Sequence, residues 1–429
     1  MKKKRVTRSG DFNHRPIWFR AVNGAMKQGF LGKQKSELNK DDLINASRRM
    51  TGLNDFGKDF WDEPLERMIQ SMNKEANLHP VGFFISRQRI INLLATRLRA
   101  EKWFKKFPEI LDQDLYPVTL IVGLQRTGTT KLHRLLSADP DNRVLKSWEA
   151  INPIPIQEKK RRVDKRIKIA RTSEKALRYM APGFFAIHPV EHNAPEEDIL
   201  LLDTTFLSTT PEATMHVPSY AKWLESTDQT YAYAYAVKLM KFLQWQQPAK
   251  RWVLKSPHHM EFLDLIDKQM ANVHYVWTHR DISSCIPSFL SMVSHSRVIF
   301  SDDINLDDVI DHWVRKTSYM LSKGLQFRDK PGNNEKFTDV FYKNLVENSP
   351  REIHRIYDRY GGIHNGFIDK FITAEEENPQ WKYGIHAYSM DDFGLTKEKL
   401  IALNGAYVEL VRQLGEKEKL FAAVSHERK

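Results

Sequence analysis

One segment of the sequence combines glycines, hydroxyls and a cation in a pattern suited to holding an anion. It reads GLQRTGTT, from Gly123 to Thr130, and it lies between the apolar run Val118–Val122 and a helical pattern. Unpaired amides at a helix start, together with the helix dipole, favour a bound phosphate-like group. We therefore predict an anion cradle here. The plainer alternative is a glycine-rich turn whose hydroxyls only cap the helix.

The same loop differs from the nucleotide triphosphatase motif GxxxxGK[ST] at one decisive position. Thr129 stands where that motif requires a lysine. A P-loop kinase that uses ATP is therefore an alternative interpretation, which this difference weakens.

The run Arg126 to Thr130, RTGTT, resembles the [RK]-[ST]-G-T-[TS] loop that binds the 5′-phosphosulfate of 3′-phosphoadenosine-5′-phosphosulfate (PAPS) in sulfotransferases. The arginine at the first position of this loop resembles the residue found there in the tyrosylprotein and bacterial branches of the family. The resemblance covers the chain from Leu53 onward and implies a PAPS-dependent sulfotransferase that acts on a hydroxyl or amine. It implies that the donor is bound by Arg126, which also acts in catalysis, and by Thr127, Gly128, Thr129 and Thr130.

A second match is HRDISSCIPSFLSM, from His279 to Met292. The family binds the 3′-phosphate of the donor with an arginine at a strand end and a serine eight positions later, which implies these roles for Arg280 and Ser288. A third match, RWVLKSPHH, resembles the lysine-proline segment of the family and implies that Lys255 is catalytic. A lysine at a strand end that only reaches toward solvent is the plainer alternative for Lys255.

An acceptor hydroxyl is a poor nucleophile, so the reaction needs a base within hydrogen-bond reach. Glu149 follows the loop helix and the turn at Asp139-Pro140, and a glutamate in this part of the chain is the base in the tyrosylprotein branch. His192 is the alternative, because an unperturbed histidine titrates near pH ~6.5. We predict Glu149 as the base, with His192 as the second candidate.

Short apolar runs, each typical of a buried parallel strand, position these motifs. They are Val118–Val122, Trp252–Leu254 and Val273–Trp277, and helical patterns alternate with them. This alternation predicts an α/β fold with a P-loop-like parallel sheet flanked by helices. Helical spacing from Lys40 to Phe107 predicts an all-helical N-terminal region, residues 1–115. The α/β core with C-terminal helices would then span residues 116–429.

Composition limits the classes of function. The chain has 429 residues, 41% of them hydrophobic, and a formal net charge of +12, which favours anionic partners. We find no apolar run long enough to span a membrane. Cys285 is the only cysteine, so the sequence predicts neither an intrachain disulfide nor a thiolate zinc cluster, and it favours a reducing cytoplasm.

Partner predictions follow from the same features. No nucleic-acid module is recognisable, so a non-catalytic polyanion binder is the less favoured alternative and no nucleic-acid partner is expected. The acceptor is expected to be a small molecule, a glycan or a lipid. The adjacent His258 and His259 would point in different directions in a regular element, so no metal is expected. The basic stretch Lys159 to Lys168 is interpreted as a solvated helix face.

Overall fold

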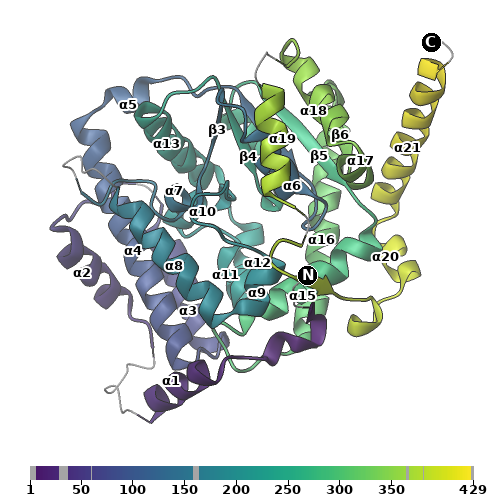
Figure 1. The fold of residues 1–429 in the computed structure, drawn as a ribbon. Coiled ribbons are helices and arrows are strands. Elements are labelled where there is room, and N and C mark those ends of the chain that lie inside the picture. Colours follow the sequence, from purple (N-terminus) through teal and green to yellow (C-terminus); the bar gives the residue numbers. More distant parts are fainter. Residues whose placement is uncertain are drawn as a thin grey trace.

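A computed structural model describes residues 6–28, 37–58, 60–157, 164–363, 367–379 and 381–426. At its centre lies a parallel sheet of five strands in the order β3-β4-β2-β5-β6 (Figure 1). The strands are β2 (Val118–Val122), β3 (Asn142–Val144), β4 (Arg251–Lys255), β5 (Val273–His279) and β6 (Phe337–Phe341). The predicted α/β fold with a parallel sheet flanked by helices is confirmed.

Strand β2 is in the middle of the sheet, between β4 and β5. Ile121 pairs with Lys255 of β4, and Val122 pairs with Trp277 of β5. Because all five strands are parallel, their carboxyl ends meet at one edge of the sheet. Ligands of open α/β folds bind at this edge. The segments that follow β2, β4 and β5 are the three that the sequence motifs single out.

Each face of the sheet has its own hydrophobic core, because neighbouring side chains on a strand point to opposite faces. Leu120 and Val122 belong to one core, whereas Ile121 belongs to the other. The three inner strands are therefore buried along nearly their whole length, and each contains a short apolar run by which its sequence could be recognised. Helix α6 (Thr129–Leu136) packs its leucines into the second core.

Further helices cover the two faces and extend the molecule at both ends (Figure 1). The central ones are α7 (Ser147–Ile151), α8 (Lys165–Met180), α9 (Pro182–Ile187), α10 (Ile199–Leu202), α11 (Thr210–Thr214), α12 (Pro218–Ser226), α13 (Thr230–Gln246), α14 (Leu263–Gln269), α15 (Ile282–Arg297) and α16 (Leu306–Arg328). The C-terminal ones are α17 (Tyr342–Glu347), α18 (Ser349–Tyr357), α19 (Phe367–Glu377), α20 (Lys397–Leu403) and α21 (Gly405–His426).

The N-terminal region is helical over α1 (Ile17–Lys27), α2 (Lys40–Thr51), α3 (Asp62–Glu75), α4 (Pro80–Lys106) and α5 (Glu109–Asp112). It also contains β1 (Val6–Arg8), which the sequence analysis did not predict and which pairs in parallel with β7 (Ile385–Ala387). Three residues are too short to show an alternating pattern. Leu94 of α4 shares a core with Leu254 of β4. The two parts therefore pack on each other. The boundary between residues 1–115 and 116–429 stays a prediction.

The structure bears on two further predictions, the absence of a membrane-spanning segment and the solvated basic stretch Lys159 to Lys168. No helix in the described part of the chain is both long and apolar enough to cross a membrane. Lys159 to Val163 of the basic stretch lie outside the described residues. The solvated face predicted there is wrong for Arg166, whose buried guanidinium donates to Asp164 and to the carbonyl of Pro153.

Candidate active site

The loop Gly123–Thr130 leaves the carboxyl end of β2 in a conformation that two glycines permit. Gly123 has φ +128, and a Cβ there would lie 2.5 Å from the carbonyl oxygen of Thr278 on β5. Gly128, the N-cap of α6, has φ +96, and its Cβ would lie 2.8 Å from the ring of Tyr342. A side chain at Gly123 would collide with β5 and one at Gly128 would collide with Tyr342, and both backbone conformations favour glycine.

Arg126 occupies a left-handed backbone conformation with φ +71, which is uncommon for a residue with a Cβ. Its Nε donates to the hydroxyl of Ser288 over 3.0 Å, and its Nη1 donates to the carbonyl of Ile187 over 3.1 Å. Both partners are neutral. Strained backbone of this kind clusters at functional sites.

Arg280 follows β5 and lies beside the loop. Its Nη1 donates to the carbonyl of Arg126 over 2.9 Å, and its guanidinium lies 4.4 Å from the centre of the Tyr342 ring. Burial and the Arg280 charge lower the pKa of Arg126 from its usual value. Within the described residues, neither guanidinium forms an ion pair with a carboxylate. Two adjacent positive charges without a counter-charge favour an anionic ligand.

Both arginines line a cavity of about 430 Å³, together with Thr130, Tyr342 and Trp381. Other cations at this cavity are already neutralised: Lys131 pairs with Glu375 over 2.7 Å, and both Arg134 and Lys382 pair with Glu191. The charge available to a ligand there therefore comes from Arg126 and Arg280. We call it the donor cavity, because the resemblance implies that both arginines bind the donor.

The remaining residues predicted to bind the donor divide into two groups. The hydroxyl of Thr127 is fully buried, donates to the carbonyl of Leu124 over 2.6 Å and contacts Thr278, so it holds the loop in shape. Thr129 is buried as the first residue of α6, whereas Thr130 is exposed and lines the donor cavity. Ser288 is buried and meets Arg280 indirectly, because both contact Arg126.

Lys255 is the last residue of β4 and is 2% exposed. Its Nζ donates to Oε1 of Glu197 over 2.6 Å, and Ser256 donates to the other oxygen of the same carboxylate over 3.3 Å. The backbone N–H of Lys255 donates to Asp198 over 3.1 Å. The lysine that the sequence singles out is thus held at the sheet edge by two neighbouring acidic residues.

His188 lines a cavity with Gln125 of the loop and with Ser256, the residue after Lys255. Its pKa is lowered to about 4, mainly by burial and also by the charges of Lys255 and Arg126, against the opposing charge of Glu197. The carbonyl of the preceding residue, Ile187, accepts from Arg126, and β2, from which the loop leaves, pairs with β4 up to Lys255. Arg126 and Lys255 therefore lie at the same edge of the sheet, near a neutral histidine.

A second cavity, of about 250 Å³, opens beside this region. Gln125 of the loop, His188, Glu197 and Ser256 line it. The rest of its wall is largely apolar and includes Phe184, Leu200, Phe289, Met292, Trp313 and Met320. Glu197, which contacts Lys255, and Ser256 join this cavity to the end of β4. We name it the acceptor cavity, after the role that we propose for it.

The two predicted bases lie elsewhere. Glu149 is 3% exposed, and its two oxygens accept from Nη1 and Nη2 of Arg143 over 3.0 and 2.6 Å. One oxygen also caps α7 by accepting from the backbone N–H of Lys146. Nδ1 of His192 pairs with Glu174 over 2.6 Å, and its ring lines a different cavity. Neither residue lines the donor or the acceptor cavity, so each role stays a prediction.

Sequence reasoning did not single out Glu197 or His188. Both lie in HPVEHNAPEEDILLL, where only His192 was chosen because it suits a base chemically. Glu197 is 58 positions from Lys255, so no local spacing joins them. The signal that could have found it is the acidic run Glu196 to Asp198 within a segment similar to the bacterial branch.

The adjacent histidines have separate partners. His259 pairs with Asp198 over 2.7 Å, whereas Nδ1 of His258 contacts Thr209 over 3.3 Å. The described residues contain no group of three or more histidine, cysteine, aspartate or glutamate side chains that could hold a metal ion.

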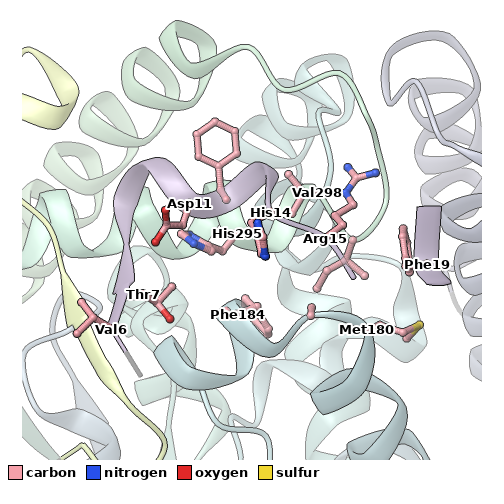
Figure 2. Close-up of a pocket in the computed structure, with 14 residues that line it drawn as sticks. Val6, Thr7, Asp11, His14, Arg15, Phe19, Met180, Phe184, His295 and Val298 are labelled. Carbon is pink, nitrogen blue, oxygen red and sulfur yellow. The ribbon is translucent and has the colours of Figure 1, made fainter. Parts of the chain in front are cut away.

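A third cavity, of about 230 Å³, lies under the N-terminal segment (Figure 2). Figure 2 shows Asp11 of that segment beside His295 of α15, with Phe184 of α9 at the opposite side. Arg15 also lines the cavity, but its guanidinium points away from His295 and donates to the carbonyl of Ser301. None of the loop residues Gly123–Thr130 lines it. Phe184 lines both this cavity and the acceptor cavity, so its ring lies at the boundary between them.

Comparison with known proteins identifies the family. The sequence model of the sulfotransferase family matches residues 117–363, which include the loop, Lys255, Arg280 and Ser288. The chain belongs to the sulfotransferase family. The predicted family is thereby confirmed, whereas the relation to the tyrosylprotein branch stays a prediction. A search of curated proteins found no match.

Solved sulfotransferase structures share the fold. Sulfotransferase STF1 from Mycobacterium tuberculosis H37Rv is 27% identical, with a TM-score of 0.75 over 87% of this chain and 100% of that one. Sulfotransferase STF9 from Mycobacterium avium is 22% identical, with a TM-score of 0.79 over 88% of this chain and 98% of that one. The similarity extends over nearly the full length of both, beyond the region that the family model matches.

Proposed function

We propose that this sulfotransferase uses PAPS as its donor and transfers the sulfuryl group to a hydroxyl or amine acceptor. The observation that carries the proposal is the pair of guanidiniums, Arg126 and Arg280, which face the donor cavity without a carboxylate partner in the described part of the chain. The cavity lies at the carboxyl edge of the sheet, beside a loop and a helix start suited to a phosphate.

The donor would lie across the two arginines. Arg126, the loop amides and Thr130 would bind the 5′-phosphosulfate, while Arg280 with Ser288 would bind the 3′-phosphate. Charge-assisted hydrogen bonds from arginine suit such oxygens in both geometry and strength. Thr127 would contribute by holding the loop rather than by its hydroxyl, which is already engaged.

In the reaction the acceptor oxygen or nitrogen attacks sulfur in line, and the bond between sulfur and the bridging phosphate oxygen breaks. The products are the sulfated acceptor and 3′-phosphoadenosine-5′-phosphate (PAP). Lys255 and Arg126 would neutralise charge that develops on the bridging oxygen and the sulfonate. The acceptor would enter from the acceptor cavity, on the side of Glu197.

For the base, the geometry favours Glu197 over Glu149 and His192. Its carboxylate contacts Lys255 and lines the acceptor cavity, so it can take the proton that the acceptor loses. Glu149 is held by both guanidinium nitrogens of Arg143, and Glu174 holds His192.

The binding of the 3′-phosphate is tested with Arg280→Ala. Because a charge-assisted bond contributes about 1.5–3 kcal/mol, calorimetry should show PAP affinity reduced by roughly 10- to 150-fold. Lys343→Ala is the matched control, since this cation lies on α17 with a largely exposed side chain. PAP affinity unchanged in Arg280→Ala would place the 3′-phosphate elsewhere.

The donor proposal also predicts activity without a divalent metal, since fixed cations would supply the charge that magnesium supplies in phosphoryl transfer. We expect turnover of PAPS in EDTA at a rate close to that of the untreated enzyme. Activity that EDTA abolishes and magnesium restores, with ATP as the better donor, would instead support the kinase alternative. Binding of polyanions without any turnover would support the non-catalytic one.

A reducing, cytoplasmic location is part of the proposal and rests on the single cysteine. Cys285 is buried within α15, and burial raises the pKa of its thiol to about 12. A thiol held in its protonated form reacts slowly. It is expected to have no role in the transfer.

A further inference from the structure

The acceptor cavity contains buried polar atoms that the transfer reaction does not use. His258 and Glu261, from the helical turn Pro257–Glu261, both line it. Among the described residues, neither Nε2 of His258 nor Oε1 of Glu261 has a hydrogen-bond partner. A buried polar atom without a partner is unfavourable, so a molecule that enters the cavity gains by supplying one.

Lys316 engages only one oxygen of Glu261, Oε2, and this leaves Oε1 without a partner among the described residues. Lys316 donates to Oε2 of Glu261 over 2.8 Å and to Glu225 over 3.1 Å, so one buried ammonium serves two carboxylates. Burial raises the pKa of Glu261 to about 7, against the effect of Lys316. Burial lowers the pKa of His258 well below its usual value, so its ring is neutral. Oε1 and Nε2 are therefore available to a hydroxyl or an amine.

The charges around the cavity disfavour anions. Glu196, Glu197 and Glu261 line it, whereas Lys316 is the lysine among its lining residues and is already shared between carboxylates. Burial raises the pKa of Glu196, which further indicates an environment hostile to negative charge. The remaining wall is largely apolar, so a ligand there would gain by burying an apolar body.

We propose that the acceptor is a small molecule with an apolar body, a reacting hydroxyl or amine at Glu197, and a second hydroxyl or amine that binds Glu261 and His258. Molecules that carry a carboxylate or another anion in the second position are rejected. The proposal rests on the proposed function and names the acceptor class of the same site.

The test compares four acceptors on one carbon chain: a linear alkanol, the diol, the amino alcohol and the hydroxy acid of equal length, over a graded set of lengths. Sulfated product is measured by mass spectrometry with PAPS supplied. At the best length, kcat/KM for the diol and amino alcohol should exceed that of the alkanol by at least about 10-fold, since a site built to bond a polar group discriminates against analogues that lack it. The hydroxy acid should be the poorest.

Glu261→Gln should reduce the preference for the amino alcohol over the hydroxy acid by at least about 10-fold, because it removes a carboxylate that attracts the ammonium. Glu225→Gln is the matched control: it also loses a carboxylate on Lys316, but Glu225 does not line the cavity. Its preference should stay near that of the unmodified enzyme. PAP affinity and melting temperature of both variants show whether the fold is kept. If Glu261→Gln does not fold, the acceptor order of the unmodified enzyme decides.

The inference is overturned if the hydroxy acid is preferred, if the second group makes no difference at any length, or if both variants shift equally. It is also overturned if no member of the series is sulfated or binds the enzyme–PAP complex in calorimetry. Each of these results leaves the donor proposal standing when PAP itself binds. Failure of PAP to bind would instead remove the proposed function.

Discussion

Glu197→Gln should lower kcat by at least about 10²-fold while leaving PAP affinity nearly unchanged, because removing a general base typically costs 10²–10⁴ in turnover. The substitution keeps the size of the side chain and its ability to accept from Lys255, but it removes the group that takes the proton. Steady-state turnover with PAPS and an acceptor found by mass-spectrometric screening gives kcat. Calorimetry with PAP gives the donor affinity.

Glu149→Gln and His192→Ala are the comparisons that decide the base. Glu149→Gln weakens a buried ion pair with Arg143, so its main effect should be a loss of stability on the order of 1–3 kcal/mol, read from thermal melting. Near-normal turnover in Glu197→Gln, beside an inactive Glu149→Gln or His192→Ala that still binds PAP, would return the role to the residue that the sequence predicts.

Lys255→Met should lower kcat by about 10²–10³-fold, the range found when one fixed group that stabilises developing charge is removed. The lysine is held at the end of β4 and its ammonium donates to Glu197, at the edge of the sheet where the loop with Arg126 leaves β2. Lys255→Arg should recover only part of the loss, since a guanidinium has a different shape.

The readout for Lys255 separates catalysis from folding. Lys255→Met leaves Glu197 without its ammonium partner, so melting temperature and PAP affinity are measured beside kcat. A normal kcat in a folded Lys255→Met variant would show that the lysine only reaches toward solvent. A double variant with Glu197→Gln should be close to the worse single variant, because residues that act as a unit are not additive.

The sheet and the loop could be predicted because their signals are local. β2 spans Val118–Val122, as its apolar run predicts, and the glycines that follow it are required at their positions. Strand ends of a parallel sheet share one edge, so the motifs after β2, β4 and β5 lie at the same edge. Arg280 and Ser288 both contact Arg126 for the same reason, because the segment after β5 begins at the edge where the loop leaves β2.

The base assignment could not be predicted with the same means, because it depends on contacts between distant segments. Glu149 follows the loop helix in sequence, but Arg143, only six positions before it, engages both of its oxygens. Glu197 reaches Lys255 from a segment 58 positions away. β1 is three residues long and pairs with β7 near the other end of the chain, so no local sequence pattern could predict it.

Titration of the unmodified protein with PAP and with ADP, under the same salt conditions, tests the donor assignment most directly. Both ligands carry two phosphates on the same adenosine: PAP has one at the 5′ position and one at the 3′ position, whereas ADP has both at the 5′ position. If Arg280 and Ser288 bind that phosphate, PAP should bind at least about 10-fold more tightly than ADP. Equal affinity for the two, or tighter binding of ADP or ATP, would contradict a PAPS-dependent transferase and favour a kinase.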